Sequence, residues 1–162
     1  MNTQTKRDYI NLLQSSLVAI QEVWQHATDI DNEWNVIDLI TRTNKRGGGT
    51  ALIAQKSNLF SVQKVVNVNK DTNLVKLRIK NNYLWICNLY FHKAEISKIQ
   101  KLFGKVMQSV PRHELTQLII VGDFNIDLNK PDENNLVLLQ KCSKELGLAI
   151  HRPDQKIGRA HV

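Results

Sequence analysis

Four short apolar runs, separated by polar turns, constrain the fold of this chain more than any other feature. They fall between residues 50 and 91 and read TALIA, FSVQKVVNV, NLVKLRIK and YLWICNLYF. Runs rich in β-branched and aromatic residues, bounded by Asn, Lys and Asp, are typical of β-strands. Their succession predicts an antiparallel meander in outline.

Further strands and helices are predicted on either side of these runs. Before them, LVAIQE and WNVIDLI are predicted strands, and the first follows a helix that contains Leu12 and Leu13. After them, KAEISKIQKLFGKVMQSV has helical spacing and should cover a sheet with one face, and QLIIV is a buried strand. The last predicted helix, NNLVLLQKCSKELGL, should turn Leu136, Leu138, Leu139, Cys142 and Leu146 inward.

Length and composition indicate one globular domain. The chain has 162 residues, of which 42% are hydrophobic, which is enough for one core. The 22 Lys and Arg residues outnumber the 15 Asp and Glu residues, and a net charge of +7 favours polyanionic partners such as nucleic acids. No apolar run approaches the ~18 residues of a membrane span, and the N-terminus lacks the layout of a signal peptide. We therefore expect no membrane partner.

The two cysteines indicate an intracellular, reducing location. Cys87 and Cys142 are too few for a disulfide framework and too far apart in sequence for a zinc site.

Polar residues at the ends of predicted strands are the candidate site. Glu22 follows LVAIQ, Tyr90 follows WICNL, and Asp123 and Asn125 follow LIIVG. Ends of neighbouring strands can converge on one point, and alternate side chains of an extended chain share a face, which would put Asp123 and Asn125 side by side. Mg²⁺ needs only one or two carboxylates, and Glu22 and Asp123 can supply them.

Each of these residues also has a purely structural interpretation. Glu22 can be a solvated strand end, Asp123 and Asn125 can form an Asx turn, and Tyr90 can be a packed aromatic residue whose hydroxyl reaches water. The segment RGGG lacks the G-x-x-x-x-G-K-[ST] spacing of a phosphate-binding loop, which favours a plain turn.

The order of the motifs resembles the endonuclease/exonuclease/phosphatase family. In register from Asn2 to about Pro153, the chain carries NTQT, VAIQEVW, RGGGTALIA, NLYFHKAE and IIVGDFNIDL. The branch that it resembles is the apurinic-endonuclease-like nuclease domain at the N-terminus of non-LTR retrotransposon polyproteins. The resemblance implies an α/β (α+β) fold, a four-layer αββα sandwich of two mixed sheets with helices outside.

The resemblance also implies residue roles in the hydrolysis of a DNA phosphodiester. Glu22 would bind Mg²⁺, for which Mn²⁺ can substitute, and Asp123 would position or deprotonate the attacking water. Asn125 would hold the phosphate, Tyr90 would stabilise the charged transition state, and Asn2 would support the metal-side network. Fixed donors and a cation where negative charge develops would stabilise the transition state more than the ground state.

The chain departs from the family pattern in ways that predict inactivity of this piece on its own. Phe91 and His92 follow Tyr90, where the family has Ala-Pro or a similar pair. The strand that usually precedes NTQT is missing, and so are the later motifs, an Asp after a Ser-Arg-Ile-like strand and a terminal Ser-Asp-His.

The departures divide the chain into two parts. Residues 1–156 are expected to form a partial domain that is truncated at its C-terminal side. Residues 157–162, IGRAHV, can be encoded by ATC GGA AGA GCA CAC GTC, which resembles a widely used sequencing-adapter sequence. We therefore expect this tail to be non-native.

The leading functional hypothesis is a fragment of a Mg²⁺-dependent endonuclease that nicks nuclear DNA for retrotransposition. A longer protein would then carry a reverse transcriptase that copies the element's RNA. The alternatives are a phosphodiesterase or phosphatase of the same fold, which fold alone does not separate, and a catalytically inactive remnant that binds nucleic acid.

Overall fold

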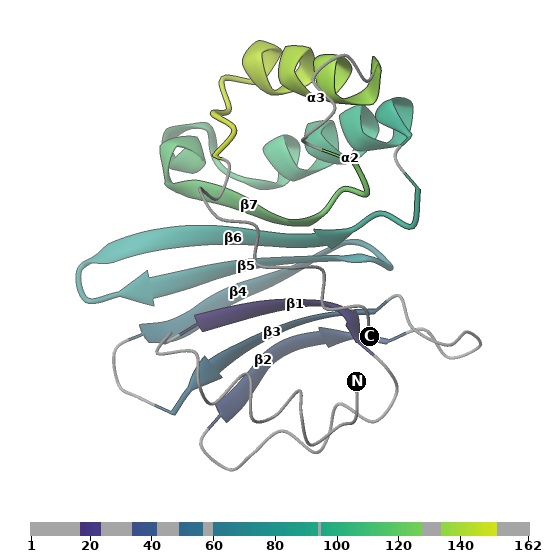
Figure 1. The fold of residues 1–162 in the computed structure, drawn as a ribbon. Helices are drawn as coiled ribbons and strands as arrows, with labels where there is room; N and C mark the ends of the chain where they lie inside the picture. Colours follow the sequence, from purple (N-terminus) through teal and green to yellow (C-terminus); the bar gives the residue numbers. More distant parts are fainter. Residues whose placement is uncertain are drawn as a thin grey trace.

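Two stacked β-sheets, with helices over the outer face of one of them, make up the described part of the chain (Figure 1). The computed structural model describes residues 17–23, 34–41, 49–56, 60–93, 95–127 and 134–151. The helix predicted around Leu12 lies outside these ranges. Three of the four expected layers are therefore within the described residues.

The small sheet is antiparallel among its described strands. It consists of β1 (Leu17–Val23), β3 (Gly49–Gln55) and β2 (Trp34–Ile40), in the order β1-β3-β2. Its two outer strands confirm the predicted strands LVAIQE and WNVIDLI. Every residue of β3 except the last is buried, which fits a central strand that is covered on both faces.

The large sheet is mixed. It has the order β4-β5-β6-β7, with β4 at Phe60–Asn69, β5 at Thr72–Ile79, β6 at Asn82–Tyr90 and β7 at Leu118–Asp123. The first three strands form the predicted antiparallel meander, and β7 pairs with β6 in parallel. The helical segment between β6 and β7 makes the crossover that a parallel pair needs.

The predicted meander was wrong in one respect, because it included TALIA. That segment is β3, which pairs with β1 and β2 in the other sheet and not with β4. The physical reason is burial: β3 needs a hydrogen-bonded neighbour on each edge and apolar cover on each face.

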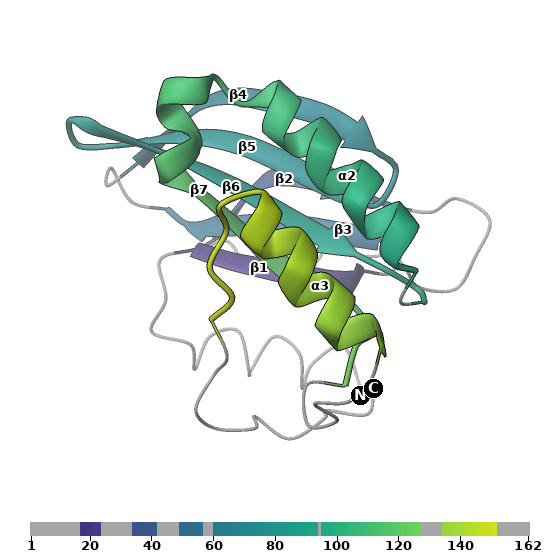
Figure 2. The same cartoon turned by 90° about the horizontal axis from the view of Figure 1, so that it is seen from above.

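Three helical elements cover the large sheet. They are α2 (Ile96–Ser109), the 3-10 helix η2 (Arg112–Gln117) and α3 (Asn134–Glu145). Figure 2 shows α2 and α3 side by side above the strands. Four residues of the apolar stripe predicted for α2 are buried, and Ile96, at its start, is partly buried. Leu138 of α3, predicted to face inward, is 41% exposed because Leu136, Leu139 and Cys142 already fill the inner face.

The two faces of the large sheet bury different cores. Leu74, Trp85, Cys87 and Leu89 pack beneath α2, whereas Val75, Leu77 and Ile86 pack against Leu52 of the small sheet. This alternation along β5 and β6 is the period-2 pattern of a strand buried on both faces.

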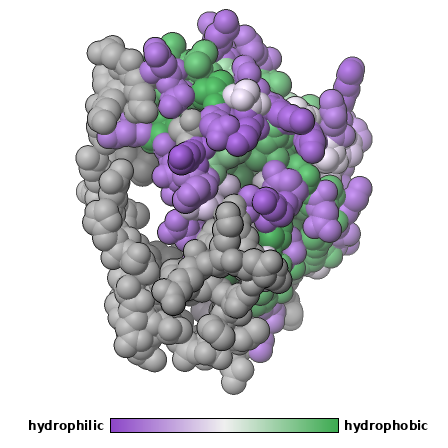
Figure 3. Space-filling view, turned by 90° about the vertical axis from the view of Figure 1, so that its right-hand side faces the viewer, coloured by the Kyte–Doolittle hydropathy of each residue, from purple (hydrophilic) through white to green (hydrophobic). Residues whose placement is uncertain are grey.

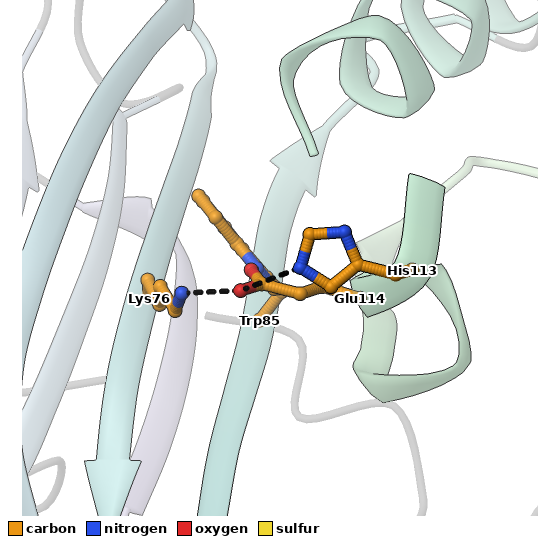
Figure 4. A network of polar contacts seen from close by, with 4 residues as sticks. All are labelled: Lys76, Trp85, His113 and Glu114. Carbon is orange, nitrogen blue, oxygen red and sulfur yellow. Dashed lines mark hydrogen bonds and ion pairs between the residues drawn. The ribbon is translucent and has the colours of Figure 1, made fainter. Parts of the chain in front are cut away.

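A charged network ties η2 to the large sheet (Figure 4). Glu114 of η2 accepts one hydrogen bond from Lys76 Nζ and one from Trp85 Nε1, both at 2.6 Å. These bonds, the one from Lys76 foremost, hold the pKa of the Glu114 carboxyl below its ordinary value of 4.5. Because η2 leads directly into β7, the network fixes where that strand begins.

Both cysteines are free and buried. Burial raises the pKa of the Cys87 thiol to about 12, so it carries no thiolate at neutral pH. Among the described residues, no helix is long and apolar enough to cross a membrane.

Candidate active site

The ends of β1, β6 and β7 lie at one edge of the sandwich, on the right in Figure 1. Figure 3 faces this side of the molecule, where hydrophilic residues gather beside exposed apolar surface. The three strands bring Glu22, Tyr90 and Asp123 to this edge, as strand-end placement predicted.

Glu22 leaves the regular strand geometry at a β-bulge. The register of β1 against β3 shifts between Gln21 and Val23, and Glu22 has a φ of 56°. Positive φ is uncommon for a residue with a Cβ and has to be held by its surroundings. A bulge re-aims the side chain that it carries, and here that side chain is directed to the other sheet.

Tyr90 makes the contact that joins the two sheets at this edge. Its Oη donates a hydrogen bond of 2.6 Å to Glu22 Oε1, across 68 residues of sequence. Tyr90 is only 5% exposed, whereas Glu22 is exposed. The buried Tyr90 hydroxyl therefore orients one oxygen of the Glu22 carboxylate, and the Glu22 side chain stays accessible to ions in solvent.

Asp123 stands next to Tyr90 in the sheet. The two residues are direct partners in the parallel ladder between β6 and β7. Val121, two residues earlier, packs between the sheets, so Asp123 shares that face and lies at its exposed rim.

Gly122 makes the close pairing at this point possible. Its φ is +151°, and a Cβ at this position would lie 2.0 Å from the carbonyl oxygen of Leu89. Any side chain here would push the end of β7 away from β6. The glycine in GDFN is thus a requirement of backbone packing that brings Asp123 level with Tyr90.

Asn125 does not stand beside Asp123 as on a strand, and that expectation was wrong. β7 ends at Asp123, and Asn125 has a φ of 51°. The backbone N–H of Asn125 donates to Asp123 Oδ1 at 2.8 Å, which is the Asx turn considered from the sequence. Asn125 Nδ2 also donates to the carbonyl oxygen of Phe91, so this side chain fastens the turn to the end of β6.

The donor set at this edge fits Mg²⁺ coordination through few protein ligands. Glu22 and Asp123 are carboxylates at the solvent-exposed rim, and no group of three or more His, Cys, Asp or Glu residues gathers in the described ranges. Mg²⁺ commonly takes one or two carboxylates and keeps water and phosphate oxygens as its other ligands. Asn2, predicted to support the site, lies outside the described residues.

Sequence reasoning missed the buried amides behind the edge. Asn88 Nδ2 donates to the carbonyl oxygens of Ile20 and Ala51, at 3.1 and 2.9 Å, and Asn88 Oδ1 accepts from Gln21 Nε2 at 2.6 Å. Beside it, Asn73 Nδ2 donates to Asp38 Oδ2 at 2.7 Å. The signal for Asn88 was a lone amide inside the apolar run YLWICNLY.

Comparison with known proteins identifies the fold. No protein-family model and no curated protein sequence matches the chain. Among solved structures, it is similar to the endonuclease domain of TRAS1, a telomere-specific non-LTR retrotransposon, with 18% identity and a TM-score of 0.68 over 93% of this chain and 65% of that one.

Two further solved structures share this similarity. An endonuclease/exonuclease/phosphatase family protein from Bacteroides thetaiotaomicron has 14% identity and a TM-score of 0.58, over 82% of this chain and 58% of that one. D. rerio TDP2 complexed with single strand DNA product has 14% identity and a TM-score of 0.54, over 79% of this chain and 55% of that one. The chain therefore has the fold of these three structures and spans 55% to 65% of their lengths.

Proposed function

We propose that this chain is part of a Mg²⁺-dependent endonuclease that nicks DNA for retrotransposition. The observation that carries the proposal is the hydrogen bond from Tyr90 to Glu22, which holds a solvent-accessible carboxylate at the edge where Asp123 also ends its strand. The similarity of the fold to a retrotransposon endonuclease domain and the net charge of +7 support DNA as the substrate. The site of action would be nuclear DNA.

In this proposal each residue at the site edge has a separate role in the reaction. Glu22 holds the cation, and Tyr90 keeps the Glu22 carboxylate in one orientation by hydrogen bonding. Asp123 accepts a proton from the attacking water or orients it, and Asn125 keeps the Asp123 turn fixed against β6. Mg²⁺, when bound, supplies Lewis-acid stabilisation of the charge that develops on the phosphate oxygens.

The same proposal assigns the remaining functions to a longer protein. Downstream domains would include a reverse transcriptase that uses the 3′-hydroxyl of the nick to copy the element's RNA. In this proposal the 162-residue chain by itself binds a cation and DNA.

Cation binding tests the assignment without depending on turnover. Mn²⁺ binding to the 162-residue chain can be measured from the electron paramagnetic resonance signal of the free ion. We expect Glu22→Gln to weaken binding roughly tenfold or more, because a carboxylate ligand is lost. Glu95→Gln is the matched control, since Glu95 is a solvent-exposed carboxylate paired with Lys98 on α2. Equal binding by the wild type and both variants would contradict the site.

Substrate choice separates the proposal from its alternatives. Relaxation of supercoiled plasmid to a nicked circle with a 3′-hydroxyl, even at a low rate, would support the endonuclease. Hydrolysis of bis-p-nitrophenyl phosphate without nicking would favour a phosphodiesterase of the same fold. Duplex DNA binding that weakens steeply with salt, with no Mn²⁺ bound at Glu22, would favour an inactive remnant.

A further inference from the structure

The backbone of Glu22 lies outside the regular hydrogen-bonded ladder that fixes the other residues of β1. It lies at the bulge of β1, where the ladder to β3 is interrupted between Gln21 and Val23, and its backbone has a positive φ. Its side chain reaches the other sheet through one hydrogen bond, to Tyr90. Because β1 and β6 belong to different sheets, contacts between the sheets set the distance between these two strands.

Asn88 makes the contacts that can set this distance. It lies on β6, two residues before Tyr90, and is fully buried. Its carboxamide bonds to one outer strand of the small sheet, β1, and to the central strand, β3, through the carbonyl oxygens of Ile20 and Ala51 and the Nε2 of Gln21. Two of these three partners lie on β1, one and two residues before Glu22.

We propose that Asn88 is a positioning residue that holds Glu22 against Tyr90 and thereby preorganises the cation site. The Asn88 side chain donates two hydrogen bonds and accepts one, and all three partners belong to the small sheet. Buried hydrogen bonds are directional, so they fix the separation of two sheets more closely than apolar contact does. The effect on cation binding rests on the function proposed above, whereas the effect on the Glu22–Tyr90 pair does not.

Asn73 is a matched control within the same layer. It is also fully buried, it is the direct ladder partner of Asn88 on β5, and it also bridges the two sheets. Its bond goes to Asp38 of β2, however, and not to β1. A residue that only stabilises the sandwich should behave like Asn73, whereas a residue that positions Glu22 should differ from it.

The first experiment compares Asn88→Leu with Asn73→Leu in the 162-residue chain. Both substitutions keep the approximate side-chain volume. Asn88→Leu removes three buried hydrogen bonds and Asn73→Leu removes one, so both should lower the urea midpoint and Asn88→Leu should lower it more. Only Asn88→Leu should raise the Kd for Mn²⁺, by roughly 10- to 100-fold, the usual size of the effect when a residue that supports a metal ligand is removed. An equal change in Kd for the two variants, or no change for either in a chain that binds Mn²⁺ at Glu22, would overturn the proposal.

A second measurement needs no metal and separates the two proposals. Glu22→Gln and Tyr90→Phe, made singly and together, define a coupling between these side chains in the stability of the chain. The coupling should disappear in the Asn88→Leu background and persist in the Asn73→Leu background. If the Glu22–Tyr90 coupling persisted in both backgrounds, the positioning role of Asn88 would be overturned. This result does not depend on whether the chain binds Mn²⁺, so it is independent of the proposed function.

A milder variant covers the case in which Asn88→Leu does not fold. Gln21→Met has a similar shape and removes only the donor to Asn88 Oδ1. It should reduce the Glu22–Tyr90 coupling and raise the Kd for Mn²⁺ in the same direction as Asn88→Leu, but less. A full wild-type coupling in Gln21→Met, together with an unchanged Kd, would contradict the proposal.

Discussion

The layer between the two sheets is polar at the site edge and apolar toward the opposite edge. Behind Glu22 and Tyr90, the sheets are joined by the amides of Asn88 and Asn73. Further along β5 and β6 the same layer contains Val75, Leu77, Ile86 and their apolar neighbours. The apolar end stabilises the sandwich without fixing its geometry closely, whereas the polar end fixes the geometry because each bond has a direction.

The largest expected effect comes from the apolar end. Leu77→Ala should lower the free energy of unfolding by about 2–5 kcal/mol, because it leaves a cavity at a fully buried position. Urea denaturation followed by tryptophan fluorescence measures the loss. We expect the folded fraction of Leu77→Ala to keep the wild-type Kd for Mn²⁺. A higher Kd in this variant would show that the apolar end of the layer also affects the cation site.

The next effect concerns the polar end. Gln21→Met should cost about 1–3 kcal/mol of unfolding free energy, because Asn88 Oδ1 is buried and loses its donor. Chemical denaturation at pH 7 tests this value. Gln63→Met is a suitable control, since the Gln63 bond to Ser61 is exposed, and an equal loss in both variants would contradict the assignment.

A smaller effect on stability is expected from the charged network of η2, and it should depend on pH, unlike the effect of the buried amides. The pKa of Glu114 is lowered in the folded state, chiefly by the hydrogen bond from Lys76, so the stability that it contributes is present above pH 4.5 and is lost as the pH falls below that value. Glu114→Gln should flatten this part of the pH profile of the urea midpoint. An acid-side slope that is unchanged in Glu114→Gln would refute the network's role.

The smallest expected effect is on α3. Leu138→Gln should change the free energy of unfolding by less than about 0.5 kcal/mol, because the side chain lies on the exposed face of the helix. Leu139→Gln is the contrasting variant, since Leu139 is buried and the change should be strongly destabilising. A large loss for Leu138→Gln would restore the inward orientation that its helical spacing predicted.

Local patterns in the sequence predicted the elements well and their pairing less well. Strands β4, β5 and β6 follow from alternation and turn residues, and α2 follows from its apolar stripe. The sheet to which β3 belongs could not be predicted, because an apolar run does not specify its hydrogen-bonding partner.

The same distinction applies to the site. Strand-end placement was enough to bring Glu22, Tyr90 and Asp123 to one edge. The positive φ of Glu22 and of Asn125 could not be predicted, because the bulge and the turn depend on contacts with other strands. The role of Asn88 depends on the same long-range contacts.

The sequence separation of the Tyr90–Glu22 bond has a consequence for folding kinetics. β4, β5 and β6 are joined by short turns and make local contacts, whereas the bond that assembles the site spans 68 residues. Local contacts form sooner and non-local ones carry a larger loop-closure cost. The site edge should therefore be the last part of the sandwich to form and the first to open, so that amide hydrogen exchange at the end of β1 is faster than in β5.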